Sequence, residues 1–414
     1  LVSQFSFAGT TGKLAGRVTA KESGEPLIGA NVMIDGSVLG AATDLDGNFY
    51  ILQIPPGTYS IRFSMIGYQS LVINDVRMMV DLTTKANGAL SESAVGLEEV
   101  VVRAERAMIQ TDVTYSQANI GSEEMDMLPV EEFEDVLALQ AGVVMTGGEI
   151  HVRGGRGGEI SYMIDGISVT DPYNSGLAVE IENNAIQELQ FISGTFNAEY
   201  GQAMSGIVNI VTKDGNFSDY SGSFSLNHSG YNSGKNTDIF HQLDRIDFNN
   251  ISDIISDIKG DIEGPIIPGK LSFFASGRFK RENGYLYGQR IFHPNSFVWS
   301  EVENIWKIDN LVGLGNGDTL SNSDILKPIL DSLRAADAFD WVAMDWHEQV
   351  TGQAKFSWRM NPYIKISYNR MYSDTKSQDY SHEYRWNPDG RSNSFNTRIG
   401  DLIRADWSIS QSTF

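Results

Sequence analysis

The second half of the sequence consists of runs of about ten residues in which apolar and polar side chains alternate. In the third run, for example, one face carries Leu271, Phe273, Ala275 and Phe279, and the opposite face carries Ser272, Ser276, Arg278 and Lys280. A period of two places alternate side chains on opposite faces of a strand, and about ten residues allow a tilted strand to cross hydrocarbon. The runs occupy residues 220–228, 258–264, 271–280, 353–358, 364–369 and 396–410.

The connections between these runs are alternately short and long. Pro265–Gly269 and Met360–Pro362 are tight turns, whereas residues 229–257, 282–349 and 374–393 are long loops. Membrane β-barrels have short turns on one side and long loops on the other. A soluble antiparallel sandwich is the alternative, because its half-buried strands alternate in the same way. Loops of this length are rare in a compact sandwich, so the pattern favours a transmembrane antiparallel barrel.

Composition excludes several other classes of protein. A formal net charge of −22 without a basic cluster argues against nucleic acid as a partner. The absence of cysteine excludes disulfides and thiolate metal sites, and no run of eighteen apolar residues exists that could form a transmembrane helix. The six histidines lack metal-ligand spacing, and no nucleophile, base and orienting group can be assembled. We therefore expect no metal site, no cofactor and no enzymatic activity.

The N-terminal segments predict an export signal and a small β domain. Ser6-Phe7-Ala8 has the small-x-small form of a signal-peptidase site, so residues 1–8 are interpreted as the remnant of an export signal, with an ordinary flexible terminus as the alternative. Residues 12–95 contain short β-prone runs separated by turn residues, which predicts a small all-β domain.

Several motifs in this segment resemble those of the carboxypeptidase regulatory-like domain. They are Gly16-Arg17-Val18, Pro26-Leu27-Ile28-Gly29-Ala30-Asn31-Val32, Thr43-Asp44 with Gly47 and Phe49, and Pro56-Gly57-Thr58-Tyr59. The resemblance implies a seven-stranded β-sandwich over residues 12–95, which is an accessory domain without catalytic residues.

Residues 97–103 form a β-branched strip, Leu97-Glu98-Glu99-Val100-Val101-Val102-Arg103, between a polar linker and an acidic stretch. An exposed β-prone strip can satisfy its backbone donors and acceptors by adding to a strand of another protein. The alternative is a short strand of the neighbouring domain.

The stretch between His151 and Lys213 contains a series of motifs: His151-Val152-Arg153-Gly154-Gly155, Tyr162-Met163-Ile164-Asp165-Gly166-Ile167, Asp171-Pro172, Ile186–Phe191, Ala198-Glu199-Tyr200-Gly201 and Ser205–Lys213. Together and in this order, these motifs resemble the plug of TonB-dependent outer-membrane receptors. The order of regulatory-like domain, box, plug and barrel is similar to that of Bacteroidota-type transporters of the Oar and SusC kind.

This resemblance implies a multidomain, mainly β fold. It comprises the N-terminal β-sandwich, a TonB-box-like segment at residues 97–103, an α/β plug at 104–215 and the first six or so strands of a 22-stranded transmembrane antiparallel β-barrel at 219–414. Six strands cannot surround a plug domain. We therefore expect the sequence to be the N-terminal part of a longer polypeptide.

The resemblance also implies sites of contact. A TonB-type energy-transducing protein would bind a periplasmic strand, for which the candidates are Glu98, Glu99, Val100, Val101, Val102 and Arg103. Charges inside a barrel are costly unless they are paired, so plug-to-wall ion pairs can act as a lock that force releases. The candidate plug charges for such a lock are Arg153, Arg156, Glu188 and Glu199.

The function implied is import of a large or scarce nutrient across the outer membrane, with the N-terminal domain and the plug on the periplasmic side. Expected partners are the TonB-type protein, outer-membrane lipid, a nutrient ligand and a surface lipoprotein. The alternatives are a surface-binding or structural protein, or a signalling receptor, with the same fold but without transport. The sequence does not identify the nutrient, because the outer loops and the plug apex carry no recognisable code for one.

Overall fold

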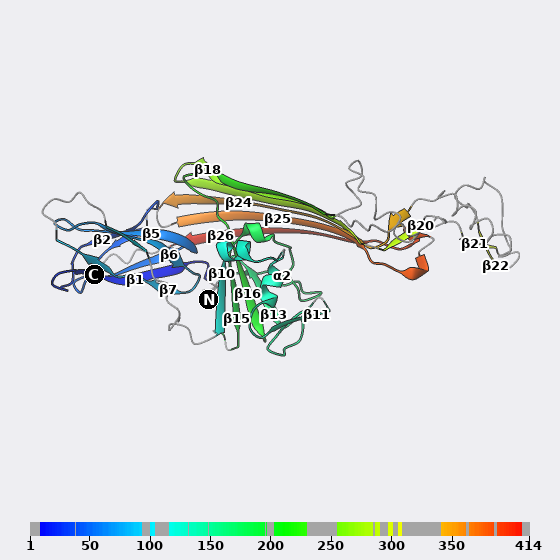
Figure 1. Ribbon diagram of the computed structural model, residues 1–414, viewed down its shortest axis with the longest axis horizontal. Helices are drawn as coiled ribbons and strands as arrows, with labels where there is room; N and C mark the ends of the chain where they lie inside the picture. Colours follow the sequence, from blue (N-terminus) through cyan, green and yellow to red (C-terminus); the bar gives the residue numbers. More distant parts are fainter. Residues whose placement is uncertain are drawn as a thin grey trace, which may run out of the picture.

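The computed structural model describes residues 9–37, 39–92, 100–103, 116–130, 132–147, 149–194, 196, 203–229, 255–284, 286–289, 297–300, 305–308, 341–361, 364–384 and 387–407. Three units are visible: an N-terminal β domain, a mixed α/β unit beside it, and a long curved sheet that extends over the α/β unit (Figure 1). Among the described residues, no helix is both long enough and apolar enough to cross a membrane.

The N-terminal domain is a sandwich of two sheets. One contains β1 (Gly12–Ala20), β4 (Asn48–Ile54), β7 (Thr83–Lys85) and β8 (Gly88–Leu90). The other has the order β3 (Gly40–Ala42), β2 (Asn31–Ile34), β5 (Gly57–Ser64), β6 (Leu71–Met78) and β9 (Val100–Arg103). Their inner faces enclose one apolar core, in which the rings of Phe49 and Phe63 meet edge to face at 5.8 Å.

The strands of this domain differ in number from the seven that the resemblance implies. Eight strands lie within the described parts of residues 12–90, and β9 adds to the edge of the second sheet from the candidate box segment. β9 runs parallel to β6, with Val100 opposite Leu71 and Arg103 opposite Asn74.

The α/β unit, called the plug below, is built on a five-stranded sheet. Its order is β10 (Ser116–Gly121), β15 (Ile186–Ser193), β16 (Gly206–Thr212), β13 (Ile160–Ile164) and β14 (Ile167–Ser168). β16 is buried throughout, as expected for a central strand that reads as an almost continuous apolar run. The remaining elements are α1 (Ser122–Met127), α2 (Phe133–Ala138), the hairpin of β11 (Val143–Thr146) and β12 (Glu149–Val152), and the short helix η1 (Asn183–Ala185).

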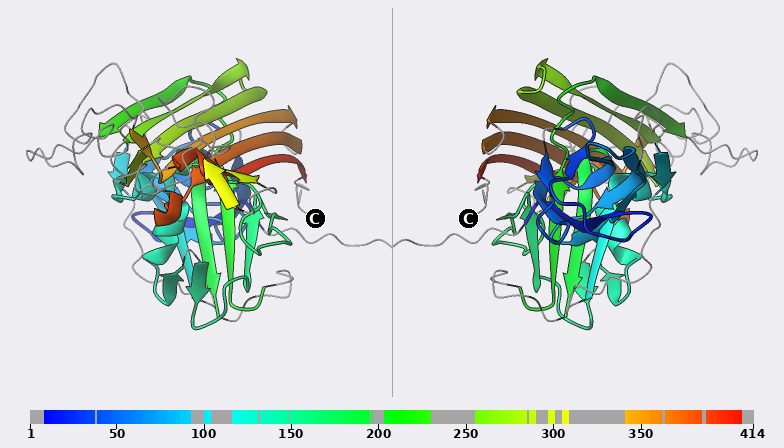
Figure 2. Two further views of the ribbon diagram at one scale, coloured as in Figure 1. Left: turned by 90° about the vertical axis from the view of Figure 1, so that its right-hand side faces the viewer. Right: turned by 90° about the vertical axis from the view of Figure 1, so that its left-hand side faces the viewer.

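The six alternating runs all form strands of one antiparallel sheet in chain order. They are β17 (Ser221–Ser229), β18 (Ile255–Ile267), β19 (Leu271–Asn283), β24 (Trp346–Asn361), β25 (Ile364–Gln378) and β26 (Ser394–Trp407). β18, β19, β24 and β25 are longer than the sequence predicted, and β24 reaches 16 residues. Seen end on, the sheet arches over the plug (Figure 2). A mainly β fold of this organisation was the fold class that the sequence predicted.

Short elements complete the described structure between these strands. They are β20 (Tyr287–Gln289), β21 (Phe297–Ser300), β22 (Ile305–Ile308), β23 (Trp341–Ala343), η3 (His382–Tyr384) and η4 (Pro388–Gly390). All of them lie in connections that the sequence predicted to be long loops.

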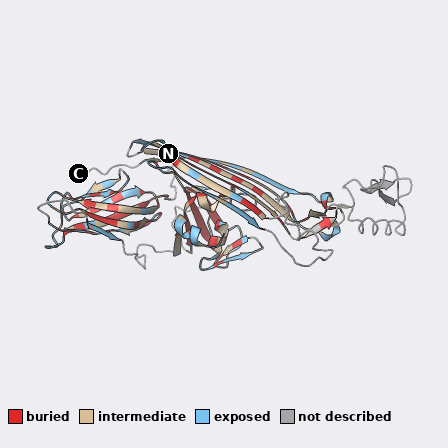
Figure 3. Ribbon diagram, turned by 45° about the horizontal axis from the view of Figure 1, so that its top comes forward, coloured by how far each residue is buried: buried red, intermediate tan, exposed pale blue. Residues whose placement is uncertain are grey.

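Buried and exposed residues alternate along strands of the curved sheet (Figure 3), and their polarity is the inverse of that in a soluble protein. The face toward the plug is polar and buried; it includes Ser272, Arg278, Thr351, Gln353, Lys355, Ser357, Asn369 and Ser373. The opposite face is apolar and exposed; it includes Ile258, Ile262, Phe279, Phe356, Trp358, Ile399, Ile403 and Trp407. A soluble sandwich buries its apolar face, so this arrangement is inconsistent with that alternative and typical of a wall in contact with lipid.

Candidate functional site

The site that joins the plug to the curved sheet is centred on Lys355 of β24. Its side chain is only 4% exposed, and its ammonium lies 2.9 Å from Asp165 Oδ2 and 3.0 Å from Asp214 Oδ1. The same ammonium donates to the Thr212 hydroxyl at 2.8 Å. Lys365 of β25 pairs with the other oxygen of Asp214. Two ammonium groups of the wall therefore neutralise two carboxylates of the plug.

Local backbone geometry brings Asp165 to this position. It occupies the turn between β13 and β14 with a φ of 50°, a left-handed conformation that Asp tolerates better than most residues. Thr212, at the end of β16, donates to the carboxylate from its backbone N–H at 2.9 Å and from its hydroxyl at 2.8 Å. The parallel pairing of β13 with β16 brings these strand ends together. Groups of the plug itself therefore orient the Asp165 carboxylate toward the lysine of the wall.

Asp214 follows β16 and stays ionised in its position. Burial alone would raise the pKa of its carboxyl, but the ammonium groups of Lys355 and Lys365 outweigh burial and hold this pKa well below its usual range. Ser357 of β24 also donates to Asp214 Oδ1 at 3.2 Å. The plug carboxylate is therefore held by ionic contacts and a hydroxyl from the wall.

A second contact lies farther along the sheet, at Arg278 of β19. Its guanidinium binds Asp257 of β18 through two hydrogen bonds of 2.6 and 2.9 Å, and it reaches Glu182 of the plug at 3.1 Å. All three side chains are buried. Thr351 of β24 donates to the other oxygen of Glu182 at 2.6 Å. Two parallel hydrogen bonds fix the plane of the guanidinium and direct its Nη1 to Glu182 of the plug.

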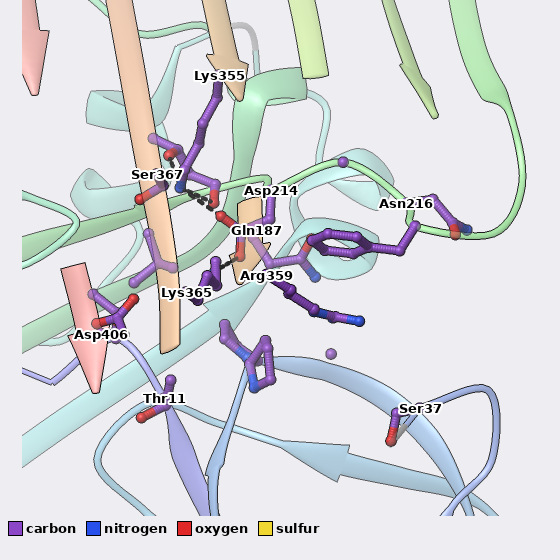
Figure 4. A pocket seen from close by; sticks show the side chains of 18 of the residues that line it. Thr11, Ser37, Gln187, Asp214, Asn216, Lys355, Arg359, Lys365, Ser367 and Asp406 are labelled. Atoms are coloured by element: carbon purple, nitrogen blue, oxygen red, sulfur yellow. Dashed lines mark hydrogen bonds and ion pairs between the residues drawn. The ribbon is translucent and has the colours of Figure 1, made fainter. Parts of the chain in front are cut away.

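A cavity of about 360 Å³ opens beside Lys355, where the plug, the curved sheet and the N-terminal domain meet (Figure 4). Lys365, Asp214 and Arg359 line it, and the guanidinium of Arg359 stacks 3.6 Å above the ring centre of Phe217. Tyr59 of the N-terminal domain also lines the cavity; burial, and secondarily the charge of Asp214, raises its pKa to about 12. The ion pairs between plug and wall therefore border a space into which water can enter.

Of the sequence-predicted lock residues, Glu188, Arg153 and Arg156 are described. Glu188 is buried and contacts the N-terminal domain: it accepts a hydrogen bond from the Val80 N–H at 2.9 Å, and another from Asn119 of the neighbouring plug strand β10. Its strand, β15, has β10 and β16 as neighbours and contacts the N-terminal domain, which is why Glu188 does not reach the curved sheet. Burial raises the pKa of Glu188 to about 7.

Arg153 and Arg156 are exposed on the loop after β12. No ion pair connects either arginine to a described residue of the curved sheet. Glu199, Glu98 and Glu99 lie outside the described residues, as do residues 1–8. The described part of the box segment, Val100–Arg103, is the strand β9.

Sequence reasoning missed the residues that do join plug and wall. Asp165-Gly166 forms a turn, for which Asp and Gly are common residues, but the carboxylate also pairs with Lys355. The available signal was the position of Lys355 on the polar face of its run, because that face points into a barrel. A lysine there requires a nearby anion, and the plug supplies it.

Comparison with known proteins agrees with this organisation. Residues 14–102 match the family model of the CarboxypepD_reg-like domain, and residues 109–208 match that of the TonB-dependent Receptor Plug Domain. The TonB-dependent transporter Oar of Myxococcus xanthus is 26% identical over 244 residues, which are 56% of this chain and 23% of Oar.

Two further relatives show similar coverage. TonB-dependent receptor P39 of Formosa agariphila is 33% identical over 208 residues, which are 47% of this chain and 19% of that receptor. TonB-dependent receptor SusC of Bacteroides thetaiotaomicron is 31% identical over 211 residues, which are 47% of this chain and 20% of SusC. The chain thus spans less than a quarter of the length of these curated relatives. The resemblance seen in the motifs is confirmed: the chain carries a CarboxypepD_reg-like domain followed by the plug domain of a TonB-dependent receptor.

Proposed function

We propose that this protein is a TonB-dependent outer-membrane transporter that imports a large or scarce nutrient, with the plug as its gate. One observation carries the proposal: the curved sheet buries its polar face against the plug and exposes its apolar face. An exposed apolar surface of this extent on a sheet of long strands fits a lipid-facing wall. A polar inner face that holds a separately folded domain fits a pore that is closed by that domain.

The nature of the plug–wall contact suits a gate that opens repeatedly. A buried ion pair such as Lys355–Asp165 has a small net free energy relative to the two hydrated charges, because the cost of desolvation offsets much of the Coulomb attraction. Water entering the neighbouring cavity can replace the wall groups as their partner. An apolar interface would instead lose about 25 cal/mol for each Å² exposed, with no compensation from water. The contact therefore holds the plug in a defined place yet yields to force.

The force must come from outside the membrane, because the outer membrane offers neither a potential nor ATP. We propose that a TonB-type protein binds residues 98–103 by strand addition, in which backbone hydrogen bonds supply most of the affinity. Support comes from β9, which is extended and has exposed valines at positions 101 and 102. Arg153, Arg156 and Glu199 remain proposed lock residues, and the contacts of Lys355 and Arg278 are added to them.

The curated relatives named above are transporters and receptors, and we propose that this chain likewise has no enzymatic activity. A nutrient ligand and a surface lipoprotein are further proposed partners. The alternative is a surface-binding, structural or signalling protein of the same fold, which would need no energised plug movement.

Deletion of residues 98–103 tests the transport function. In cells that lack the gene, a panel of polysaccharides, peptides and metal chelates identifies the compounds whose uptake requires the protein. The deletion variant should then keep surface binding of such a compound and lose its uptake. A matched control, Val101→Ser with Val102→Ser, keeps the backbone and should keep uptake. Uptake that survives the deletion would contradict energised transport and favour the alternative.

A further inference from the structure

β9 is the edge strand of the five-stranded sheet of the N-terminal domain. It has β6 on one side, and no other described strand adjoins its other side. Val101 and Val102 are exposed, Val101 to 58%. Among the described residues, one ion pair crosses from β9 to β6: Arg103 to Asp75 at 3.2 Å, which is exposed and adds little stability. The candidate box is therefore already ordered as a strand with one open backbone edge.

The strand that holds β9 also leads directly to the plug. β6 ends at Met78, and two residues later Val80 is fully buried against the plug sheet. The Val80 peptide is bound from both sides: Glu188 of β15 accepts from its N–H at 2.9 Å, and Asn119 of β10 donates to its carbonyl at 3.4 Å. In the same interface Gln190 of β15 donates to Asp81 at 3.4 Å. The N-terminal domain is thus anchored to strands β10 and β15 of the plug sheet.

We propose that the N-terminal domain transmits force: β9 stays paired with β6 while its open edge binds the extended strand of the TonB-type protein, and the Val80–Glu188 contact passes the load to β15. This inference rests on the proposed function and adds a route for the force. It assigns the domain a mechanical role in place of a merely accessory one.

Physical arguments support this route. A strand already held in a sheet has lost its conformational freedom, so a partner strand binds it at a lower entropic cost than it binds a flexible peptide. A pull along β9 loads its hydrogen bonds to β6 together, because the two strands are parallel and in continuous register. The covalent connection from Arg103 to Ser116 can extend to at most about 40 Å. The proposed route requires that the docked domain bears load before that connection is taut, and the force measurement below tests this requirement.

A disulfide between β6 and β9 tests whether β9 stays docked. Asn74 and Arg103 are opposite each other, and the sequence contains no cysteine, so Asn74→Cys with Arg103→Cys can form only the intended bond. Binding of the purified periplasmic domain of the TonB-type protein is measured to the oxidised and the reduced protein in lipid nanodiscs. We expect dissociation constants within about twofold of each other, whereas a loss of tenfold or more on oxidation would overturn the proposal, because β9 would then have to leave β6.

The same assay separates this inference from the function on which it rests. If neither the reduced variant nor the wild type binds the periplasmic domain, the proposed function fails and the force route falls with it. If the wild type self-associates and Val101→Asp abolishes that association, the open edge belongs to a second copy of the chain, and the proposal is overturned.

Force measurements test the load path at Glu188. The protein is held in a bilayer and pulled through the bound periplasmic domain, and the extension at the first plug transition is recorded. Glu188→Ala should delay that transition by up to about 40 Å, because the load then reaches the plug only through the covalent connection. Glu188→Gln keeps an acceptor for Val80 and should behave as the wild type. Glu124→Ala, which removes an exposed pair with Arg77 in the same interface, is the matched control and should have no effect.

Amide hydrogen exchange distinguishes local undocking from a general loss of plug structure in the Glu188→Ala variant. Faster exchange at Val80 alone reports undocking, whereas faster exchange throughout β16 reports damage to the plug. If the plug is damaged, the force measurement is made on Asn119→Ala instead of Glu188→Ala. Asn119→Ala removes the donor to the Val80 carbonyl. An unchanged extension in a variant whose Val80 amide is deprotected would overturn the load path.

Discussion

The ammonium of Lys355 lies 3.0 Å from the carboxylate of Asp214, although the two residues are 141 positions apart and belong to different units. Asp165 shares the same ammonium at 2.9 Å. Removal of the lysine would leave two carboxylates without this cation in a largely buried place. We therefore expect Lys355 to contribute to the attachment of the plug to the curved sheet.

Lys355→Met should weaken the attachment of the plug. Loss of one partner of a buried pair typically costs about 3–5 kcal/mol, because the other charge is left without compensation. Lys376→Met is the matched control: Lys376 also pairs with carboxylates, but its side chain is 39% exposed, so its loss should cost less than about 1 kcal/mol. Denaturant unfolding of the plug in nanodiscs measures both. Equal midpoints for the two variants would contradict a role of Lys355 in holding the plug.

Substitutions at Asp165 separate the charge from the backbone conformation. Asp165→Asn keeps a residue that tolerates a positive φ and loses the charge, whereas Asp165→Ala loses both and should be less stable by a further amount of about 1 kcal/mol. Asp165→Gly restores the backbone preference alone and should resemble Asp165→Asn more closely than Asp165→Ala. Thermal unfolding checks this order. If the Asp165→Ala variant is as stable as the Asp165→Asn variant, the left-handed backbone conformation at this turn places no constraint on the residue type.

Docking of the N-terminal domain should weaken as pH rises. Burial raises the pKa of Glu188 to about 7 in the docked state, with Asp81 acting in the same direction and Arg77 in the opposite one. The docked state therefore binds a proton more tightly than the undocked state. Its stabilisation is complete below about pH 4.5 and is lost as pH rises to about 7.

Spin labels at Leu45→Cys and Tyr173→Cys, both highly exposed, can report the distance between the N-terminal domain and the plug. The undocked fraction should increase from pH 5 to pH 8, and Glu188→Gln should abolish that dependence. A pH response that persists in Glu188→Gln would assign the titration to another group.

A charge on the outer face of the curved sheet should be costly only if that face contacts lipid. Ile262 of β18 is 53% exposed, and Ile28 of the N-terminal domain is 52% exposed. Ile262→Arg should destabilise the protein in a bilayer by about 2–4 kcal/mol, the cost of arginine on a lipid face near the midplane. Ile28→Arg should change stability by about 0.5 kcal/mol or less, as for an ordinary water-exposed position. Unfolding in nanodiscs compares them, and equal small effects would argue against lipid contact at Ile262.

The strands of the curved sheet could be predicted from sequence because their signal is local. From Val350 to Asn361, polar side chains in β24 alternate with apolar or small residues, and a two-residue connection fixes its antiparallel partner. The plug core was equally visible: β16 reads as an almost continuous apolar run, and it is buried throughout.

The contacts between units could not be predicted in the same way. Asp165 and Lys355 are 190 positions apart, and which carboxylate meets which ammonium depends on how the plug sits under the sheet. The partner of Glu188 could not be predicted either. The sequence places a charged residue in the plug, but it does not reveal that the backbone N–H of Val80, in another domain, donates a hydrogen bond to it. β9 was ambiguous for a related reason: its β-prone residues suit either a free strip or an edge strand, and only the position of β6 decides between them.

The length of β24 has a consequence for the proposed transporter. Its 16 residues span roughly 35–40 Å along the membrane normal at the tilt usual for such strands, whereas the apolar band of an outer-membrane barrel is about 25 Å tall. In the proposed membrane setting, the strand would therefore project beyond the lipid by roughly 10–15 Å. On the proposed function, such a projection would form a rigid rim, a vestibule in which large solutes could be retained before they reach the plug.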